Sequence, residues 1–216
     1  DSPSIRVSES KTQLIEHQGL SGAVLQTNPR RSVMELSYTL YLVQPSEEQL
    51  FSFLKLFLKE GFWLENASFK TIRFWCYKVY HTPVQKDKLG VYELKVTFSC
   101  HPTKWFKTTT SQVFRTSGTL RSQGSAIAFP KITISGNSSS ETSFTIGDDV
   151  IRLERLQETL IMDNNPSQPS FKTQRGQPVK WSGDFISIDA ARNDSVGVVL
   201  GAGITSLTIE MNWGWA

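Results

Sequence analysis

The sequence predicts a mostly-β protein organised in two domains. Apolar and polar residues alternate with a period of two in several segments, most clearly in 34–42, 92–100 and 207–215, as expected for strands with one buried face. Turn-forming residues recur about every 8–12 residues in the second half, a spacing typical of β-sandwiches. Strong helical periodicity follows residue 46 only. At 216 residues the chain can form one large all-β domain or two small ones.

The single predicted helix covers residues 47–60. Its start is a capping box, because the side chain of Ser46 can accept a hydrogen bond from the backbone of Gln49, whose own side chain reaches back. Two glutamates in the first turn favour the positive end of the helix dipole, and Gly61 fits a C-terminal stop. Apolar residues recur at helical spacing, so we expect a wide apolar face that packs on the neighbouring sheet: Leu50, Phe53, Leu54, Phe57 and Leu58, widened by Phe51 and Leu56.

A β-hairpin follows the helix. Residues 62–80 are rich in aromatic side chains, which suit strands, and 91–100 alternates regularly. The polar run 81–90 between them indicates a loop. The two cysteines, Cys76 and Cys100, fall near the ends of these strands. They are either a disulfide or two buried small apolar residues, and no further ligands at metal-binding spacing accompany them.

The composition changes near residue 107, where a polar run follows Trp105 and Phe106. We expect the domain boundary between about 104 and 118 and assign residues 1–107 to an N-terminal β-sandwich-like domain with one helix and a long hairpin. Residues 108–216 then form a C-terminal β-sandwich. Strands are expected at 129–134, at 143–146 and at the C-terminal end, whereas 150–162 fits neither periodicity.

Composition excludes several classes of function. The formal net charge of +3 is too small to indicate nucleic-acid binding. No run approaches the roughly 20 apolar residues of a membrane-spanning helix, and the first ten residues show no secretion signal. The histidines stand beside no nucleophile elbow, metalloprotease helix or paired cysteine ligands: His17, His81 and His101.

Two pairs of aspartates are candidates for chemistry. Asp148 and Asp149 follow Gly147 and read as a solvated turn, since the spaced oxygens of an EF-hand calcium loop are missing. Asp184 and Asp189 flank a short apolar segment and would suit a glycosidase only at a fixed separation. We therefore expect no enzyme, with no catalytic, cofactor-binding or metal-binding residue.

Tryptophans could either stack on sugars or pack in a core: Trp63, Trp75, Trp181, Trp213 and Trp215. Trp213 and Trp215 share the alternation of Leu207 and Ile209, which favours a core or a subunit interface.

The order of these segments resembles that of the distal tail (Dit) proteins of long-tailed bacteriophages. The helix with its leucine and phenylalanine face, the aromatic strand and the hairpin resemble the family's N-terminal domain, which residues 96–106 (VTFSCHPTKWF) would close. Residues 160–163 (LIMD), 182–188 (SGDFISI), the turn at 201–204 and the last strand resemble its galectin-like C-terminal domain. The sequence departs from the family at 189–194, where DAARND replaces a proline-rich turn and a glycine.

The resemblance implies assembly rather than catalysis. Dit-like proteins form homohexameric rings that join the last ring of the tail tube to the tail-tip proteins. The implied partners are the copies of the chain itself, the major tail-tube protein, the tape-measure protein, the tail-tip or hub protein, and receptor-binding or tail-fibre proteins. The implied place is the tail tip of the virion, assembled in the host cytoplasm, with DNA only passing through the channel and with no membrane or cofactor.

An alternative function is a baseplate carbohydrate-binding or host-adhesion module. The chain is compact for the family, so we expect no inserted carbohydrate-binding module. In the ring, we expect the hairpin around residues 72–100 to contact a neighbouring copy of the chain, and its tip is polar. The candidate inter-subunit contacts are Arg73, Trp75, Lys86, Asp87, Lys88, Tyr92 and Trp105.

Overall fold

The computed structural model describes residues 9, 11–16, 19, 21–26 and 31–216. The chain divides into two compact units, Asp1–Lys104 with Ala216 and Trp105–Trp215. This division falls between Lys104 and Trp105, whereas the sequence places the domain boundary after residue 107. His17 and most of the first ten residues lie outside the described residues.

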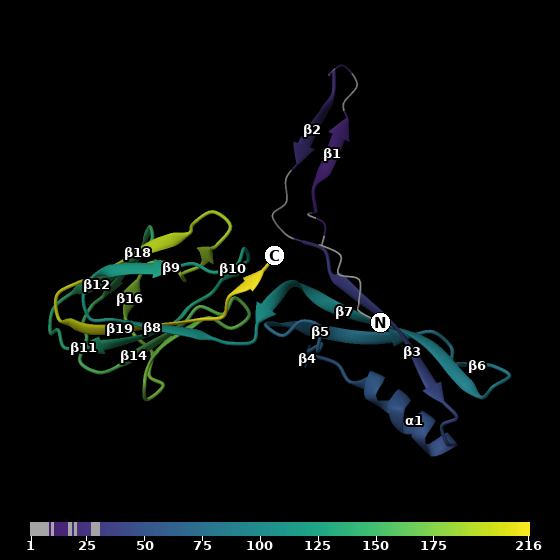
Figure 1. Ribbon diagram of the computed structural model, residues 1–216. Coiled ribbons are helices and arrows are strands. Elements are labelled where there is room, and N and C mark those ends of the chain that lie inside the picture. Colours follow the sequence, from purple (N-terminus) through teal and green to yellow (C-terminus); the bar gives the residue numbers. More distant parts are fainter. Residues whose placement is uncertain (1–8, 10, 17–18, 20, 27–30) are drawn as a thin grey trace. The chain divides into compact units, whose positions relative to one another are not determined.

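The mostly-β fold class is confirmed (Figure 1). In the first unit, β1 (Gln13–Glu16) and β2 (Ala23–Gln26) form a separate two-stranded hairpin. The larger sheet is six-stranded: β20 (Gly214–Trp215), β7, β5 and β4 follow in that order, and β3 and β6 also pair with β7. Its other strands are β3 (Met34–Val43), β4 (Phe62–Leu64), β5 (Ile72–His81), β6 (Gln85–Lys86) and β7 (Val91–Phe106).

Alternation along the strands gives this sheet its buried face. β3 and β7 pair without interruption from Met34↔Cys100 to Val43↔Val91. Because directly opposed residues lie on the same face of a sheet, the apolar members of both strands gather there, and Met34, Leu36, Leu94 and Val96 are all buried. On β5 the buried residues are Ile72, Phe74 and Cys76. The predicted strands in these segments are confirmed.

The turn of the long hairpin is held by Asp87. Its carboxylate accepts hydrogen bonds from the backbone N–H groups of Leu89 (2.8 Å) and Val91 (2.7 Å). Gly90 has a φ of +80°, a conformation that glycine adopts without steric cost. The predicted hairpin is therefore confirmed, with the short strand β6 inside the segment expected to be loop.

The helix is shorter than predicted. The capping box at Ser46 is present, with N–H to oxygen distances of 3.2 and 2.9 Å. However, α1 covers only Glu47–Lys55, and a 3-10 turn, η1 (Leu56–Leu58), replaces the rest. Gly61, with a φ of +62°, ends the segment as expected.

The expectation that Leu58 belongs to the packing face and that Phe51 and Leu56 widen it was wrong. Leu58 is 80% exposed, and Phe51 and Leu56 are 60% and 65% exposed. Successive helical residues are about 100° apart, so Phe51 lies off the stripe formed by Leu50, Phe53 and Leu54. No residue of α1 is buried, and the helix therefore retains apolar surface.

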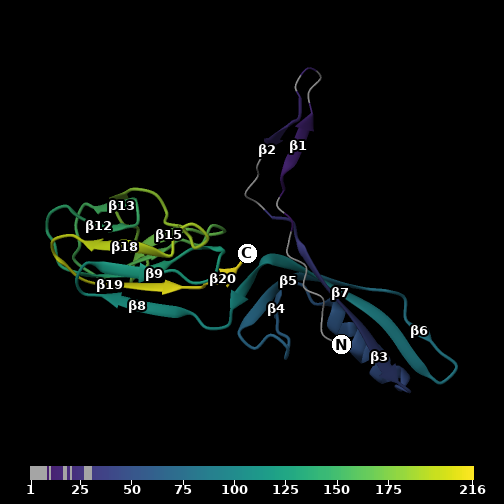
Figure 2. The ribbon, with the colours of Figure 1, turned by 45° about the horizontal axis from the view of Figure 1, so that its top comes forward.

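The second unit is the predicted β-sandwich, built from two five-stranded sheets (Figure 2). One has the order β15-β14-β11-β19-β8 and the other β16-β13-β12-β18-β9. The strands are β8 (Thr110–Phe114), β9 (Gly118–Arg121), β10 (Ile127–Ala128), β11 (Lys131–Gly136), β12 (Thr142–Ile146), β13 (Asp149–Leu153), β14 (Leu160–Asp163), β15 (Ser170–Thr173), β16 (Trp181–Ser182), β17 (Ile188–Asp189), β18 (Ser195–Leu200), β19 (Ile204–Met211) and β20 (Gly214–Trp215).

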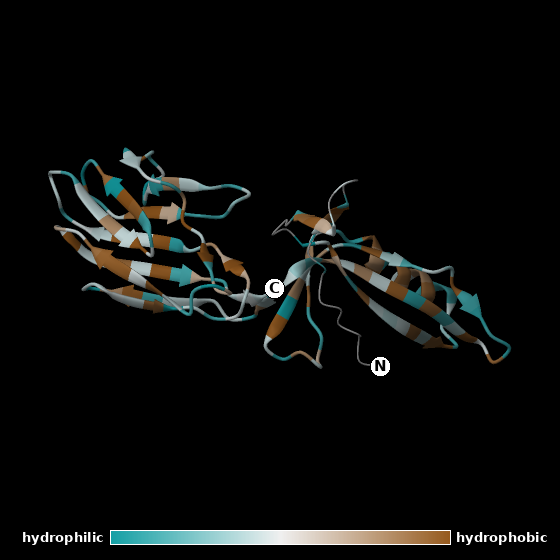
Figure 3. Ribbon diagram, turned by 90° about the horizontal axis from the view of Figure 1, so that it is seen from above, coloured by the Kyte–Doolittle hydropathy of each residue, from teal (hydrophilic) through white to brown (hydrophobic). Residues whose placement is uncertain are grey.

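The core of the sandwich lies between the sheets. Alternate residues of the inner strands are buried, including Ile132, Ile134, Phe144, Ile151 and Ile209. Figure 3 shows the resulting alternation of hydrophobic and hydrophilic residues along these strands. Two adjoining β-sheets that bury one face each explain why the period-two pattern dominates this half.

Two segments contain strands that the sequence pattern did not predict. Residues 150–162, which fit neither periodicity, contain β13, a connection and β14. The buried leucines Leu153, Leu156 and Leu160 therefore belong to three different elements and share no common period. The polar run after Phe106, near the expected domain boundary, is partly strand, because β8 begins at Thr110.

Candidate functional site

The candidate contact residues occupy separate places rather than one patch. Arg73 and Trp75 lie on β5. Lys86, Asp87, Lys88 and Tyr92 surround the hairpin turn, on β6, the turn itself and β7, whereas Trp105 belongs to the second unit.

Arg73 and Trp75 form a cluster with Trp63, called the Trp63–Arg73 cluster below. Trp63 of β4 lies opposite Trp75 of β5, and their rings meet edge to face at 5.1 Å. The Arg73 guanidinium lies 4.1 Å from the centre of the Trp63 ring, within the range of a cation–π interaction. Trp63 is still 42% exposed, so the cluster presents an aromatic surface beside a charge.

One polar atom of this cluster is unsatisfied. Arg73 Nε is buried and has no hydrogen-bond partner among the described residues. A buried donor without an acceptor costs about 1–3 kcal/mol. The cluster is thus incomplete in the isolated chain.

The hairpin tip is polar with one apolar residue. Lys86 Nζ lies 5.5 Å from the centre of the Tyr92 ring, directly across the β6–β7 pair. The Asp87 carboxylate is engaged by the turn backbone, as described above, so its first role is structural. Lys88 is exposed, and Leu89 is 76% exposed. The tip therefore offers two amino groups and one leucine to a partner.

The sheet of the first unit has two open edges. Among the described residues, β3 and β4 each pair with a neighbour on one side only. β3 is ten residues long, and its outer residues Tyr41 and Val43 are 57% and 73% exposed. Edge strands present unpaired backbone N–H and C=O groups that another chain can pair with. A strand of another chain can therefore be added at either edge of this sheet.

The β1–β2 hairpin is also uncovered by the residues that the structure describes. No residue of either strand is buried, and Leu14, Val24 and Leu25 are 71%, 51% and 57% exposed. At its base, the N–H of Ser32 donates to the carbonyl of Glu9 at 3.1 Å. An isolated two-stranded hairpin is marginally stable in water, so this one favours a partner that covers its apolar side chains.

The buried titratable residues of the first unit have structural surroundings. Cys76 and Cys100 are free thiols and wholly buried. The hydrogen bond with Cys76 and burial both raise the pKa of Cys100, which disfavours the reactive thiolate. His101 Nδ1 accepts from the N–H of Thr103 at 3.0 Å, and burial lowers its pKa.

The acidic residues of the second unit form no metal site among the described residues. Burial, then the charges of Asp184 and Asp148, raise the pKa of Asp149. Asp189 is instead held by Arg192 at 3.2 Å and by the N–H of Ala191 at 3.0 Å. The charge of Asp184 thus acts on Asp149, whereas Asp189, the other member of the candidate glycosidase pair, is bound by Arg192 and Ala191.

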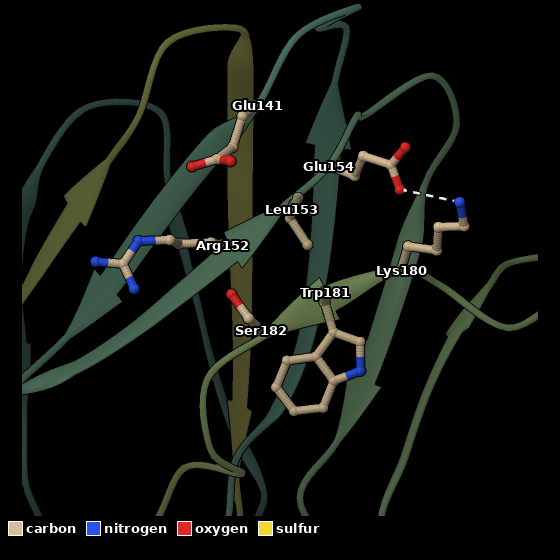
Figure 4. A pocket seen from close by; sticks show the side chains of 7 residues that line it. All are labelled: Glu141, Arg152, Leu153, Glu154, Lys180, Trp181 and Ser182. Atoms are coloured by element: carbon tan, nitrogen blue, oxygen red, sulfur yellow. Dashed lines mark ion pairs between the residues drawn. The ribbon is translucent and has the colours of Figure 1, made fainter.

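An open groove of about 240 Å³ lies on the sandwich (Figure 4). Trp181 packs between Phe171 and Phe185, at ring distances of 5.3 and 5.2 Å, and Figure 4 shows its indole pointing away from Glu141. Lys180 and Glu154 form an exposed ion pair at 3.3 Å. The groove is lined by Glu141, Arg152, Leu153, Glu154, Lys180, Trp181 and Ser182.

The last tryptophans have different surroundings. Trp213 is 1% exposed, and its Nε1 donates to the Thr110 hydroxyl at 2.9 Å. Trp215 is 48% exposed and meets the Phe106 ring at 5.7 Å. Of these two tryptophans, only Trp213 is a core residue.

Among the described residues, no helix combines the length and hydropathy needed to cross a membrane.

Comparison with known proteins gives matches in structure only. No protein-family model matches the sequence, and no curated protein is similar to it. A chain in the activated, calcium-containing baseplate of phage P2 is 12% identical and aligns over 98% of this chain and 89% of its own length, with a TM-score of 0.45.

A stronger match is the Dit protein of phage SPP1, described as a paradigm of the hub adsorption apparatus in phages that infect Gram-positive bacteria. It is 12% identical and aligns over 98% of this chain and 90% of its own length, with a TM-score of 0.77. Across both of its units, the chain has the fold of a phage distal tail protein.

Proposed function

We propose that the chain is a structural, non-enzymatic protein of the tail of a long-tailed bacteriophage. It is a distal tail protein, six copies of which form a ring that joins the tail tube to the tail-tip or baseplate proteins. The observation that carries this proposal is the fold shared with the SPP1 Dit protein over 98% of the chain, because that protein belongs to a hub adsorption apparatus.

The open sheet edges support ring formation. β3 is antiparallel to β7, and β4 is antiparallel to β5. β5 and β7 are the neighbouring arms of one hairpin, so β3 and β5 share a direction that β4 opposes. The β4 edge of one copy and the β3 edge of the next can therefore pair antiparallel, in a head-to-tail contact. Such heterologous contacts close into rings when the rotation between copies fits.

The remaining exposed surfaces suit further partners. The hairpin tip and the apolar β1–β2 hairpin are open in the isolated chain. In the proposed assembly they and Trp105 contact neighbouring copies, the tail-tube protein, the tape-measure protein, the tip or hub protein, or receptor-binding proteins. The ring lies at the tail tip of the virion, is assembled in the host cytoplasm and lets DNA pass through its channel.

The proposal is tested by the oligomeric state of the purified protein. Mass photometry and negative-stain electron microscopy, alone and with the tail-tube protein, are expected to show rings of six. A strict monomer at high concentration that also forms no ring with the tail-tube protein contradicts the proposal.

A second candidate function is carbohydrate binding by the sandwich. One observation favours it: the groove combines part of an indole with carboxylates and the Arg152 guanidinium, groups that hydrogen-bond and stack on sugars. Titration with mono- and oligosaccharides, followed by tryptophan fluorescence, tests this function. A saturable signal that Arg152→Ala removes, and that the exposed control Glu158→Ala retains, supports it, whereas no signal with any saccharide contradicts it.

A further inference from the structure

We propose that Arg73 is the docking site for an acidic side chain of a second copy of this chain, and that Glu35 of that copy is the side chain. The inference rests on the proposed ring and adds the residues that centre its subunit contact. The same two residues then recur at every interface of the ring, one on each side.

The Trp63–Arg73 cluster has the composition and state of an interface centre. Arginine and tryptophan are the residues that most often dominate binding energy at interfaces. Arg73 has a covered Nε that finds no acceptor in the described part of the chain, and Trp63 keeps 42% of its surface in solvent. A partner that brings an acceptor to the guanidinium and covers the indole completes both groups at once.

The position of the guanidinium places it within reach of an added strand. Arg73 belongs to β5, one strand inside the edge, but its guanidinium lies over the Trp63 ring of β4 at 4.1 Å. Neighbouring strands in a sheet are about 4.8 Å apart. A strand paired to the open edge of β4 therefore runs about one strand spacing from the charge.

Glu35 lies on the matching face of the other edge. Met34 is opposite Cys100, and Met34, Cys76 and Cys100 are all buried, so these residues lie on the covered face. Side chains alternate along a strand, which places Glu35 and Arg73 together on the other face. When β3 of one copy extends the sheet of another, both side chains are on the same side of the joint sheet.

Charge singles out Glu35 as the partner. It is the only charged residue of β3, whose sequence is MELSYTLYLV. Glu35 is exposed and has no ion-pair partner among the described residues. A carboxylate can accept two parallel N–H bonds from a guanidinium, and the indole on one side strengthens the pair by excluding water.

The experiment exchanges the two charges between copies. Arg73→Glu and Glu35→Arg are made singly and together, with Arg115→Glu and Glu158→Arg as controls that make the same charge changes at exposed positions of the second unit. Assembly is followed by sedimentation velocity and electron microscopy, and folding by circular dichroism and thermal unfolding.

Each single variant is expected to weaken assembly by at least about 30-fold, the effect of losing one hot-spot residue. Mixing Arg73→Glu with Glu35→Arg in equal amounts restores rings, because copies that alternate around an even-numbered ring place a glutamate against an arginine at every interface. The double variant also assembles by itself. The mixing experiment also distinguishes a lost contact from misfolding, since two unfolded variants could not restore each other's assembly.

Three results overturn the inference and leave the ring intact: wild-type rings with single variants that assemble normally, loss of assembly for Arg73→Glu alone, or no rescue by mixing. The second of these would assign Arg73 to a different acceptor or partner. A wild-type chain that forms no ring in any condition refutes the proposed function itself, so the two failures are distinguishable.

Discussion

The two C-terminal tryptophans provide the sharpest test of the second unit's core. Trp213 is 1% exposed and Trp215 is 48% exposed, although both have the same parity in the sequence. A buried tryptophan removes about 150–250 Å² from water, which at about 25 cal/mol per Å² corresponds to roughly 4–6 kcal/mol. Trp213→Ala also leaves the Thr110 hydroxyl without its donor. We therefore expect a loss of about 3–5 kcal/mol, a large part of the stability of a small domain.

Trp215→Ala is the matched control. It removes the same side chain from a half-exposed position with one ring contact, so we expect a loss of roughly 1 kcal/mol or less in the isolated chain. Hydrogen exchange measured by mass spectrometry in increasing urea reports the two units separately through their own peptides. Equal losses of protection in residues 105–215 for the two variants would refute the assignment of Trp213 alone to the core.

Three other outcomes follow from local contacts. Ser46→Ala removes the capping-box acceptor and is expected to destabilise α1 by about 0.5–2 kcal/mol, measured by exchange in helix peptides, with Ser46→Asp as the retaining control. Burial lowers the pKa of His101 below 6.5. Between that lowered pKa and pH 6.5, the unfolded state binds more protons than the folded state. The stability of the first unit is therefore fully present above pH 6.5 and declines as the pH falls through that window. Denaturation as a function of pH should show this decline in the wild type and a smaller one in His101→Gln, and an unchanged slope would count against the assignment. Finally, amides of 13–16 and 23–26 should exchange rapidly in isolated copies and slowly in assembled rings, because no residue of β1 or β2 is buried in the single chain. Equal exchange in both states would show that assembly leaves this hairpin uncovered.

Much of the fold is visible in the sequence because the buried faces are periodic. Met34 and Leu36, or Leu94 and Val96, alternate with polar residues and are buried as the period requires. The capping box at Ser46 predicted the helix start, which depends on local hydrogen bonds. The helix end was less predictable, since a 3-10 turn replaces the last part of a continuous apolar pattern.

The missed elements lack a one-sided pattern. The β1–β2 hairpin carries neighbouring apolar residues, such as Leu14 and Ile15, on both faces and buries neither. Trp215, for which the sequence left a core and a subunit interface open, lies outside the core, because β19 ends at Met211 and a new strand begins at Gly214. Alternation does not continue across such a break.

The candidate site was predictable only in part. Arg73 and Trp75 were expected as contacts from their place on the hairpin. Their partner Trp63 was considered only for sugars or packing, because β4 has three residues, too few to show a period. The residue order does not display two tertiary features: the pairing of β4 with β5, and the lack of an acceptor for Arg73 Nε among the residues that the structure describes.

The central claim is that copies of this chain assemble head to tail through the open edges of one sheet. Cryo-electron microscopy of the purified protein, alone or with the tail-tube protein, tests it most directly. We expect a ring of six in which β3 of each copy lies beside β4 of its neighbour. A chain that stays monomeric in both preparations, or a ring in which these two edges remain unpaired, would contradict the claim.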